Sequence, residues 1–244
     1  MTNRQSILAI ALQIAVGTFA GTDSLAGRED GISETARSDF PIGELSCRRG
    51  LSKYRVIGTV VGTRHTVLTV AHFTEGGSMP SGERLRGCKF RLFDADGRPR
   101  FESFVSIVSR PTVSQKWSLA LDWAVLRLEE PAPVKPAEHL AISSALENGD
   151  QSLAYLHHSK GRRLIQWADR CAVSRATSTS IVLKHECPSW RGTSGSPLIV
   201  RTQTGDKVIG VQAKVGGIAV GLDGWPLNEL GLAIASEVER SKDR

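Results

Sequence analysis

Residues 191–200 read Arg-Gly-Thr-Ser-Gly-Ser-Pro-Leu-Ile-Val, a run of small residues that ends in proline and leads into an apolar, β-branched segment. Such a run lets the backbone turn sharply and lets a ligand approach the main chain closely. A serine at this turn, Ser194, can present its hydroxyl outward. The N–H groups of Gly192 and Ser194 can then converge on one point, as an oxyanion hole requires. An ordinary Gly/Ser turn before a strand explains this stretch equally well.

Two further stretches favour the catalytic interpretation. Residues 67–72 read Val-Leu-Thr-Val-Ala-His and place His72 at the end of an apolar strand, and residues 122–126 read Asp-Trp-Ala-Val-Leu and place Asp122 at the head of another. A serine nucleophile needs a base, and the base needs an orienting partner. Taken singly, His72 fits a core histidine and Asp122 a strand-start cap. Together with Ser194 they predict a catalytic triad, in which His72 moves the proton and Asp122 holds the ring.

These stretches, Ala71-His72, Asp122-x-Ala-Val-Leu and Gly192-x-Ser-Gly-Ser-Pro, resemble the trypsin-like serine peptidases. The chain order His, Asp, Ser is that of the chymotrypsin group. The Ser-Gly-Ser-Pro form, with no Asp before the serine, is closer to the bacterial glutamyl-endopeptidase branch than to the digestive enzymes. The resemblance covers roughly residues 46–235. It implies an all-β fold of two Greek-key β-barrels of the chymotrypsin type, with the triad in the cleft between them and a short C-terminal helix.

Composition agrees with an all-β fold. The chain has 244 residues, of which 40% are hydrophobic and 24 are glycine, and segments with helical periodicity are scarce. The net charge of +6 is weak evidence for a nucleic-acid partner. The sequence has no Lys/Arg-rich run interleaved with aromatic residues, so nucleic-acid binding is not expected.

The first residues read as a targeting segment. Arg4 precedes an apolar stretch over residues 7–20, which is too short for a membrane span, and small residues offer two cleavage sites. We expect a signal peptide over residues 1–26 and no stable membrane association; an uncleaved anchor is the alternative. A polar leader or pro-segment is expected over 27–45, an N-terminal barrel with His72 and Asp122 over 46–135, and a C-terminal barrel with Ser194 over 136–244. A proline-rich stretch over 131–136 marks the boundary between the barrels.

The four cysteines are even in number and follow an expected signal peptide, which predicts disulfide bonds and a secreted or periplasmic protein. Four cysteines allow three pairings. Proximity in sequence favours Cys171–Cys187, and the resemblance points the same way, which leaves Cys47–Cys88. Four free thiols would fit a cytosolic protein. Neither CxxC nor HxxxH spacing occurs, so no metal or other cofactor is expected, and the adjacent His157 and His158 are assigned to a surface turn.

The resemblance also implies where substrate binds. The pocket wall would come from two short segments, residues 188–190 and residues 212–214. They contain the expected substrate-binding residues Ser189, Trp190, Gln212, Ala213 and Lys214. Pro188 stands where trypsin carries the acid that selects basic residues. Gln212 falls about where glutamyl endopeptidases carry a histidine, and Ala213 near a serine that contacts the triad aspartate in many relatives. These departures put the residue preference in doubt.

The sequence therefore predicts a secreted or periplasmic serine endopeptidase that cleaves protein or peptide substrates through an acyl-enzyme. A catalytically silent chymotrypsin-like fold used as a binding protein is the alternative from a different class. An ester hydrolase on the same triad is a third interpretation. The sequence makes no prediction of an oligomeric state.

Overall fold

The computed structural model describes residues 40–49, 52–74, 84–94, 97–109, 119–139, 153–160, 164–167, 171–177, 181–202 and 204–222. All of them belong to the compact unit Ile32–Arg244. The expected signal peptide and C-terminal helix lie outside the described residues. Among the residues described, no helix combines the length and apolar character needed to cross a membrane.

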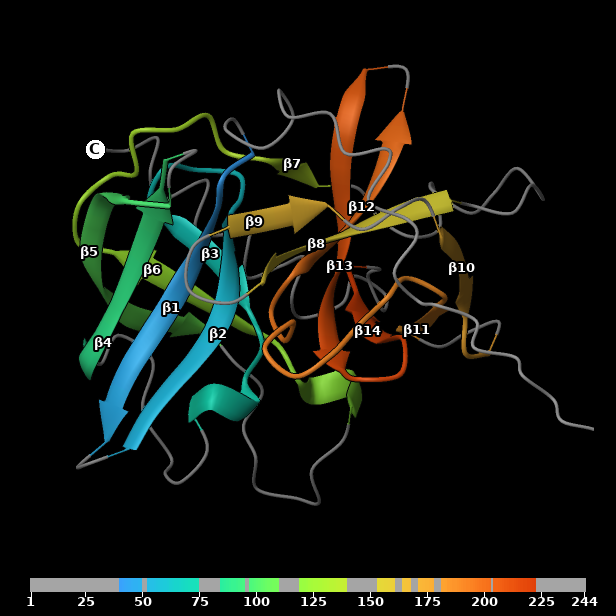
Figure 1. Ribbon diagram of the computed structural model, residues 1–244, viewed down its shortest axis with the longest axis horizontal. Coiled ribbons are helices and arrows are strands. Elements are labelled where there is room, and N and C mark those ends of the chain that lie inside the picture. Colours follow the sequence, from blue (N-terminus) through green and yellow to red (C-terminus); the bar gives the residue numbers. More distant parts are fainter. Residues whose placement is uncertain are drawn as a thin grey trace, which may run out of the picture. The chain divides into compact units, whose positions relative to one another are not determined.

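The first half of this unit is a closed barrel of six antiparallel strands in the order β1-β2-β3-β6-β5-β4 (Figure 1). Its strands are β1 (Ile42–Arg49), β2 (Ser52–Val60), β3 (Thr66–Thr69), β4 (Arg84–Phe93), β5 (Pro99–Ser109) and β6 (Ala124–Leu128). Closure leaves no exposed sheet edge, and the inward positions of the strands meet in one interior.

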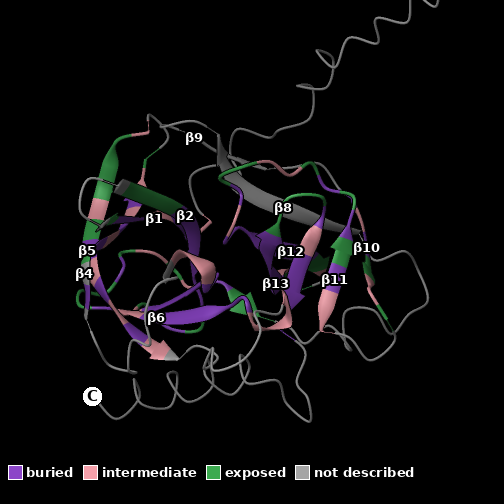
Figure 2. Ribbon diagram, turned by 90° about the horizontal axis from the view of Figure 1, so that it is seen from below, coloured by how far each residue is buried: buried purple, intermediate pink, exposed green. Residues whose placement is uncertain are grey.

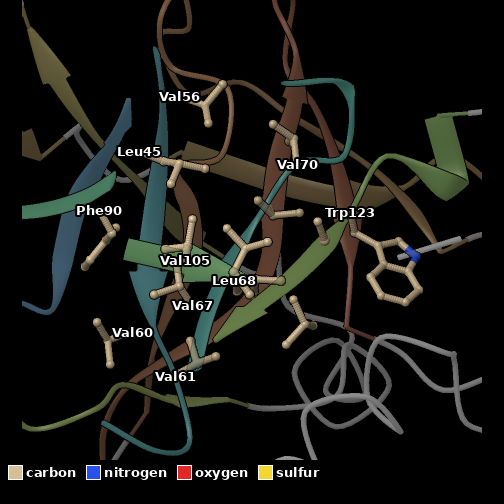
Figure 3. Close-up of a cluster of buried hydrophobic side chains, with 14 of the residues drawn as sticks. Leu45, Val56, Val60, Val61, Val67, Leu68, Val70, Phe90, Val105 and Trp123 are labelled. Atoms are coloured by element: carbon tan, nitrogen blue, oxygen red, sulfur yellow. The ribbon is translucent and has the colours of Figure 1, made fainter. Parts of the chain in front are cut away.

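The barrel interior is filled mostly by branched aliphatic side chains, together with Phe90 (Figure 3). Leu45, Val60, Val67 and Phe90 are fully buried and come from four different strands. β6 is buried along almost its whole length rather than on alternate residues (Figure 2). The same core cluster continues into the second half of the chain through buried residues that include Ile199, Val208, Val211 and Val220. Both faces of β6 are therefore largely covered, which explains why all of its residues except Arg127 are apolar.

The second half is an eight-stranded sheet in which the main path runs β10-β11-β14-β13-β12-β8-β9. Its strands are β7 (Glu138–His139), β8 (Leu153–Lys160), β9 (Leu164–Trp167), β10 (Cys171–Arg175), β11 (Val182–His185), β12 (Pro197–Thr202), β13 (Gly205–Lys214) and β14 (Ile218–Gly221). β7 joins β13 in parallel, and β10 also pairs with β8. The described strands thus show a closed barrel followed by a second sheet, and essentially no helix.

The proline-rich boundary between the halves is attached to the first barrel. The Ala132 N–H donates to the Arg64 carbonyl at 2.8 Å, and Arg64 Nε donates back to the Ala132 carbonyl at 2.6 Å. Ala132 is fully buried, and Ala137 bridges to Val61. The three prolines suggest a stiff extended linker, and the structure shows that this segment is hydrogen-bonded to the first barrel at Ala132 and Ala137.

Two sequence-based expectations are corrected. β1 begins at Ile42, so residues 42–45 belong to the barrel and not to the leader; Ile42 and Leu45 are buried although polar or small residues separate them. His157 and His158 lie within β8, paired with Trp167 and Gln166 of β9, and not in a turn. In both places the backbone pairing of neighbouring strands outweighs the local polar composition.

The four cysteines form two disulfide bonds. Cys47 and Cys88 are directly opposite each other on β1 and β4, with Cα atoms 4.0 Å apart. Cys171, at the start of β10, is joined to Cys187, two residues after β11. This is the pairing that the sequence favoured, with one bond in each half.

Candidate active site

Asp122 is fully buried and lies between the short 3-10 turn η3 (Leu119–Leu121) and β6. Its Oδ1 accepts hydrogen bonds from the N–H groups of Ala71 at 3.0 Å and His72 at 2.9 Å. Its Oδ2 lies 2.8 Å from the ring Nδ1 of His72. Three N–H donors thus converge on one carboxylate, and these hydrogen bonds offset the cost of burying its charge.

Strand register explains why the two residues meet. β3 and β6 are antiparallel, and Thr69 is opposite Ala124. His72, which opens the 3-10 turn η2 (His72–Thr74), follows β3, and Asp122 precedes β6. Residues that follow one strand of an antiparallel pair lie beside residues that precede the other. The sheet therefore places the imidazole next to the carboxylate.

This pairing has a chemical consequence for the ring. Because the Asp122 carboxylate only accepts hydrogen bonds, it selects the tautomer of His72 in which Nδ1 carries the proton. Nε2 then presents a lone pair, and the side chain of His72 is 29% exposed while that of Asp122 is fully buried. A half-exposed imidazole with a fixed tautomer is equipped to act as a general base.

Ser194 lies in a tight turn before β12. Gly192 and Gly195, on either side of it, have φ angles of +98° and +85°, which only glycine adopts without strain. The turn is closed by the N–H of Thr193, which donates to the Trp190 carbonyl at 3.1 Å, and by the N–H of Ser196, which donates to the Thr193 carbonyl at 3.0 Å. Ser194 itself is half-buried. The sequence predicted a sharp turn here, and the structure has one.

This turn is docked on the first barrel. The carbonyl of Ser194 accepts a hydrogen bond from the N–H of Ile57, on β2, at 2.8 Å. A Cβ at Gly195 would lie 1.9 Å from the Ile57 carbonyl oxygen and 2.7 Å from Thr69 Oγ1, so the backbones are in close contact. Thr69 Oγ1 also donates to that carbonyl, at 2.6 Å. The serine turn is thereby attached to the strand that leads to His72.

The N–H groups of Gly192 and Ser194 have no hydrogen-bond acceptor among the described residues. The other N–H groups of the turn are used: that of Gly195 donates to the Gln212 carbonyl at 2.8 Å, and those of Thr193 and Ser196 close the turn. Two free donors beside a half-buried serine are the arrangement that can accept a developing negative charge.

A family model described as trypsin-like peptidase domain matches residues 57–211, more than half of the chain. The chain belongs to the trypsin-like peptidase family. The matched region runs from β2 into β13 and contains His72, Asp122 and Ser194. A comparison with curated proteins gave no match.

Membership of the trypsin-like peptidase family supports a serine-peptidase type of function and protein or peptide substrates. The residues expected to bind substrate differ in their exposure. Ser189 and Trp190 are half-buried and Lys214 is exposed, whereas Gln212 and Ala213 are buried. Ser189 Oγ accepts hydrogen bonds from the N–H groups of Gly216 and Gly217 at 3.1 and 3.3 Å, which attaches the first expected wall segment to the turn between β13 and β14.

One polar residue of this region was not predicted from the sequence. His185, on β11, is 6% exposed, and its Nε2 is hydrogen-bonded to Oε1 of Gln212. Burial lowers the pKa of His185, although the hydrogen bond to Gln212 and the backbone of Cys187 oppose that shift. The available signal was that His185 lies two residues after Leu183 and so shares its face of the strand, but this spacing does not say what a buried histidine contacts.

His185 also lies next to a disulfide. Potential ligand atoms of Cys171, His185 and Cys187 lie within 4.8 Å of one another. The two sulfurs are bonded to each other. Of these three residues, only His185 therefore keeps an atom that could bind a metal, Nδ1. One nitrogen does not supply the donor set of a zinc site.

Proposed function

We propose that the protein is an exported serine endopeptidase that uses His72, Asp122 and Ser194 as a catalytic triad. The observation that carries the proposal is the buried Asp122 carboxylate, which receives both the ring Nδ1 and the main-chain N–H of His72. A structural aspartate needs hydrogen bonds, but it does not need to orient a half-exposed histidine. The docking of the Ser194 turn on β2, through Ile57, supports the same assignment.

In this proposal His72 Nε2 takes the proton of the Ser194 hydroxyl as Oγ attacks the carbonyl carbon of the substrate. The N–H groups of Gly192 and Ser194 stabilise the resulting oxyanion, each contributing about 3–4 kcal/mol by analogy with other oxyanion holes. The C–N bond then breaks as His72 passes the proton to the leaving amine, which produces an acyl-enzyme. Water, deprotonated by His72, hydrolyses the ester and regenerates Ser194.

We further propose that substrate contacts come from Ser189, Trp190 and Lys214, with Gln212 and Ala213 supporting them from beneath. This division follows from exposure, since a buried side chain contacts substrate only where a pocket opens onto it. Within the family, the Ser-Gly-Ser-Pro turn supports a place near the glutamyl-endopeptidase branch. The amide of Gln212 carries no charge, so a preference for acidic residues would need Lys214 or Arg191, both of which are exposed.

Export is proposed from two observations. The chain holds two disulfide bonds, which persist in oxidising compartments. The apolar stretch over residues 7–20 has the composition of a signal peptide. We propose removal of residues 1–26 and a location outside the cell or in the periplasm. A second barrel is proposed for the C-terminal half, because the pairing of β10 with β8 links the ends of a six-strand path.

The test is peptide-library cleavage by three versions of the mature protein: wild type, Ser194→Ala and Ser196→Ala. Ser196 is a matched control because its hydroxyl is buried and has no hydrogen-bond partner among the described residues, so its loss removes an unsatisfied group. We expect Ser196→Ala to cleave like wild type and Ser194→Ala to lose about 10⁶-fold in kcat. No cleavage by wild type would favour the binding-protein alternative, and cleavage of esters but not peptides would favour the ester hydrolase.

A further inference from the structure

Gln212 is hydrogen-bonded to three parts of the second half of the chain, which are the turn of Ser194, strand β11 and its own strand β13. Its main-chain carbonyl accepts a hydrogen bond from Gly195 N–H, and its N–H donates to the Ser196 carbonyl, both at 2.8 Å. Its side-chain Nε2 donates to the Lys214 carbonyl at 2.7 Å, and its Oε1 is bonded to His185 Nε2. Gln212 is fully buried. Its main chain therefore holds the turn of Ser194, while its side chain is held by β11 and by its own strand.

The side-chain bonds matter because the strand is irregular at this point. In the pairing of β13 with β14, Gln212 is opposite Ala219 and Lys214 is opposite Ile218, so Ala213 has no partner of its own. A bulge of this kind leaves the local backbone less determined by the ladder. The bond from Gln212 Nε2 to the Lys214 carbonyl spans the bulge, and His185 fixes the opposite end of the same amide.

The orientation of the amide determines the protonation of His185. Gln212 Nε2 must face the Lys214 carbonyl, because both an amide oxygen and a carbonyl only accept. Oε1 therefore faces His185, and Nε2 of His185 must carry the proton. The remaining ring nitrogen, Nδ1, is buried and has no hydrogen-bond partner among the described residues. The geometry thus specifies a neutral ring.

Among the described residues, no ionised group of opposite charge faces His185. β10 brings Val173 opposite it, and the turn before β14 brings Gly217, whose carbonyl accepts the His185 N–H at 2.8 Å. The titratable residues next to it in sequence, Lys184 and Glu186, are both exposed. The nearby cysteines are bonded and do not titrate. Burial is accordingly the main influence on the pKa of His185 and lowers it.

We propose that His185 is a positioning residue for the nucleophile: by donating to the Gln212 amide, it holds the bulged strand β13, to which Gly195 and Ser196 are hydrogen-bonded. The inference rests on the proposed peptidase function. Protonation of the buried Nδ1 would place a positive charge beneath this strand, and the backbone of Cys187 offsets only part of the cost of burying it. The neutral form of His185 is thus the form that supports an aligned Ser194 turn.

The test compares His185→Phe, which removes the donor, with His185→Gln, whose amide N–H can donate to the same oxygen. His139→Gln is the control, since His139 is an exposed histidine on β7 and takes no part in the hydrogen bonds of Gln212 described above. Below the unfolding temperature of each variant, we expect His185→Phe to lose about 10- to 100-fold in kcat with little change in KM, as displaced catalytic groups do. His185→Gln should recover most of this loss, and His139→Gln should match wild type.

Hydrogen exchange at the Gly195 amide, which donates to Gln212, gives a readout that does not need catalysis. We expect faster exchange in His185→Phe and protection in His185→Gln. Equal kcat and equal exchange in wild type and His185→Phe would overturn the positioning role. A wild type that cleaves nothing but shows the expected exchange pattern would contradict the proposed function and leave the positioning role supported.

Discussion

Asp122 holds His72 at two points, because one carboxylate oxygen accepts the main-chain N–H at 2.9 Å and the other lies 2.8 Å from ring Nδ1. The bond to the main-chain N–H fixes the backbone of His72 at the start of η2. The bond to ring Nδ1 fixes the rotation of the imidazole. A single buried carboxylate therefore determines both the position and the tautomer of the imidazole.

Asp122→Asn keeps the size of this side chain but can present an N–H to the ring. We expect kcat to fall by about 10⁴-fold, because the wrong tautomer of His72 is stabilised. Steady-state kinetics on a cleaved peptide measures the change. Asp206→Asn is the control, since the Asp206 carboxylate accepts hydrogen bonds from the exposed Arg201 at 2.9 and 3.2 Å and orients no histidine among the described residues. Equal activity of Asp122→Asn and wild type would remove Asp122 from the mechanism.

Gly195→Ala tests the contact between the serine turn and the barrel. Gly195 and Gly205 both have positive φ, so an alanine at either position costs about 1–3 kcal/mol of backbone strain. At Gly205 the added Cβ meets nothing within 4 Å, whereas at Gly195 it would clash with the Ile57 carbonyl. Urea unfolding should show a clearly larger loss for Gly195→Ala than for Gly205→Ala. Equal losses would mean that the turn is not packed against β2.

Activity should not depend on a particular new N-terminus. In digestive relatives, a freed amine pairs with an acid just before the nucleophile, but here that residue is Thr193. Thr193 is 1% exposed, and its Oγ1 donates to the Trp190 carbonyl at 2.8 Å, so the turn is held by its own hydrogen bonds. Chains that begin at residues 27, 32 and 38, each with an extra leading glycine, should have equal kcat. Turnover by one of them alone would require an insertion site for its amine.

The free energy of unfolding should decrease at acidic pH because His185 takes up a proton more readily in the unfolded chain. Burial lowers the pKa of His185 in the folded protein, whereas the unfolded chain has a value of about 6.5. Between these two values the unfolded state binds more protons, so the free energy of unfolding decreases as pH falls below about 6.5. Urea titrations across this range should give a shallower decrease for His185→Gln than for wild type. A parallel decrease in both proteins would show that His185 does not titrate differently on folding.

The disulfide Cys171–Cys187 closes a loop of 16 residues in the nucleophile-bearing half. Replacing both cysteines by serine should lower the free energy of unfolding by about 3 kcal/mol, which is the loop-closure estimate for that length. The Cys47–Cys88 bond spans 41 residues, so its removal should cost somewhat more on the same argument. Chemical denaturation of the two double variants measures both values. Non-reducing peptide mapping that paired Cys47 with Cys171 or Cys187 would contradict the structure.

The parts of this protein that depend on a local residue pattern are predictable from the sequence. The small-residue run around Ser194 and the apolar strands beside His72 and Asp122 carry their signal in a few adjacent residues, and the structure brings His72 and Asp122 into contact. The start of the barrel was predicted too late, at residue 46 instead of Ile42. The reason is that β1 is specified by its pairing with β2 and β4 rather than by its own composition.

The role of Gln212 and His185 was less accessible for the same reason. They are separated by 27 residues and meet only because β11 and β13 both flank β14. Sequence position suggested that Gln212 lines a substrate pocket, but it does not reveal that both ends of the amide are already bonded. Contacts between strands that are distant in sequence depend on register, which short motifs do not encode.

The most direct test of the proposed triad is labelling of the folded protein with a serine-directed fluorophosphonate, followed by mass mapping of the modified residue. The phosphorus–oxygen bond forms only at a serine activated by a base and served by an oxyanion site. The triad predicts stoichiometric modification of Ser194, none at the neighbouring Ser196, and loss of labelling in His72→Ala. Absence of labelling in wild type, or labelling that persists in His72→Ala at the same rate, would contradict it.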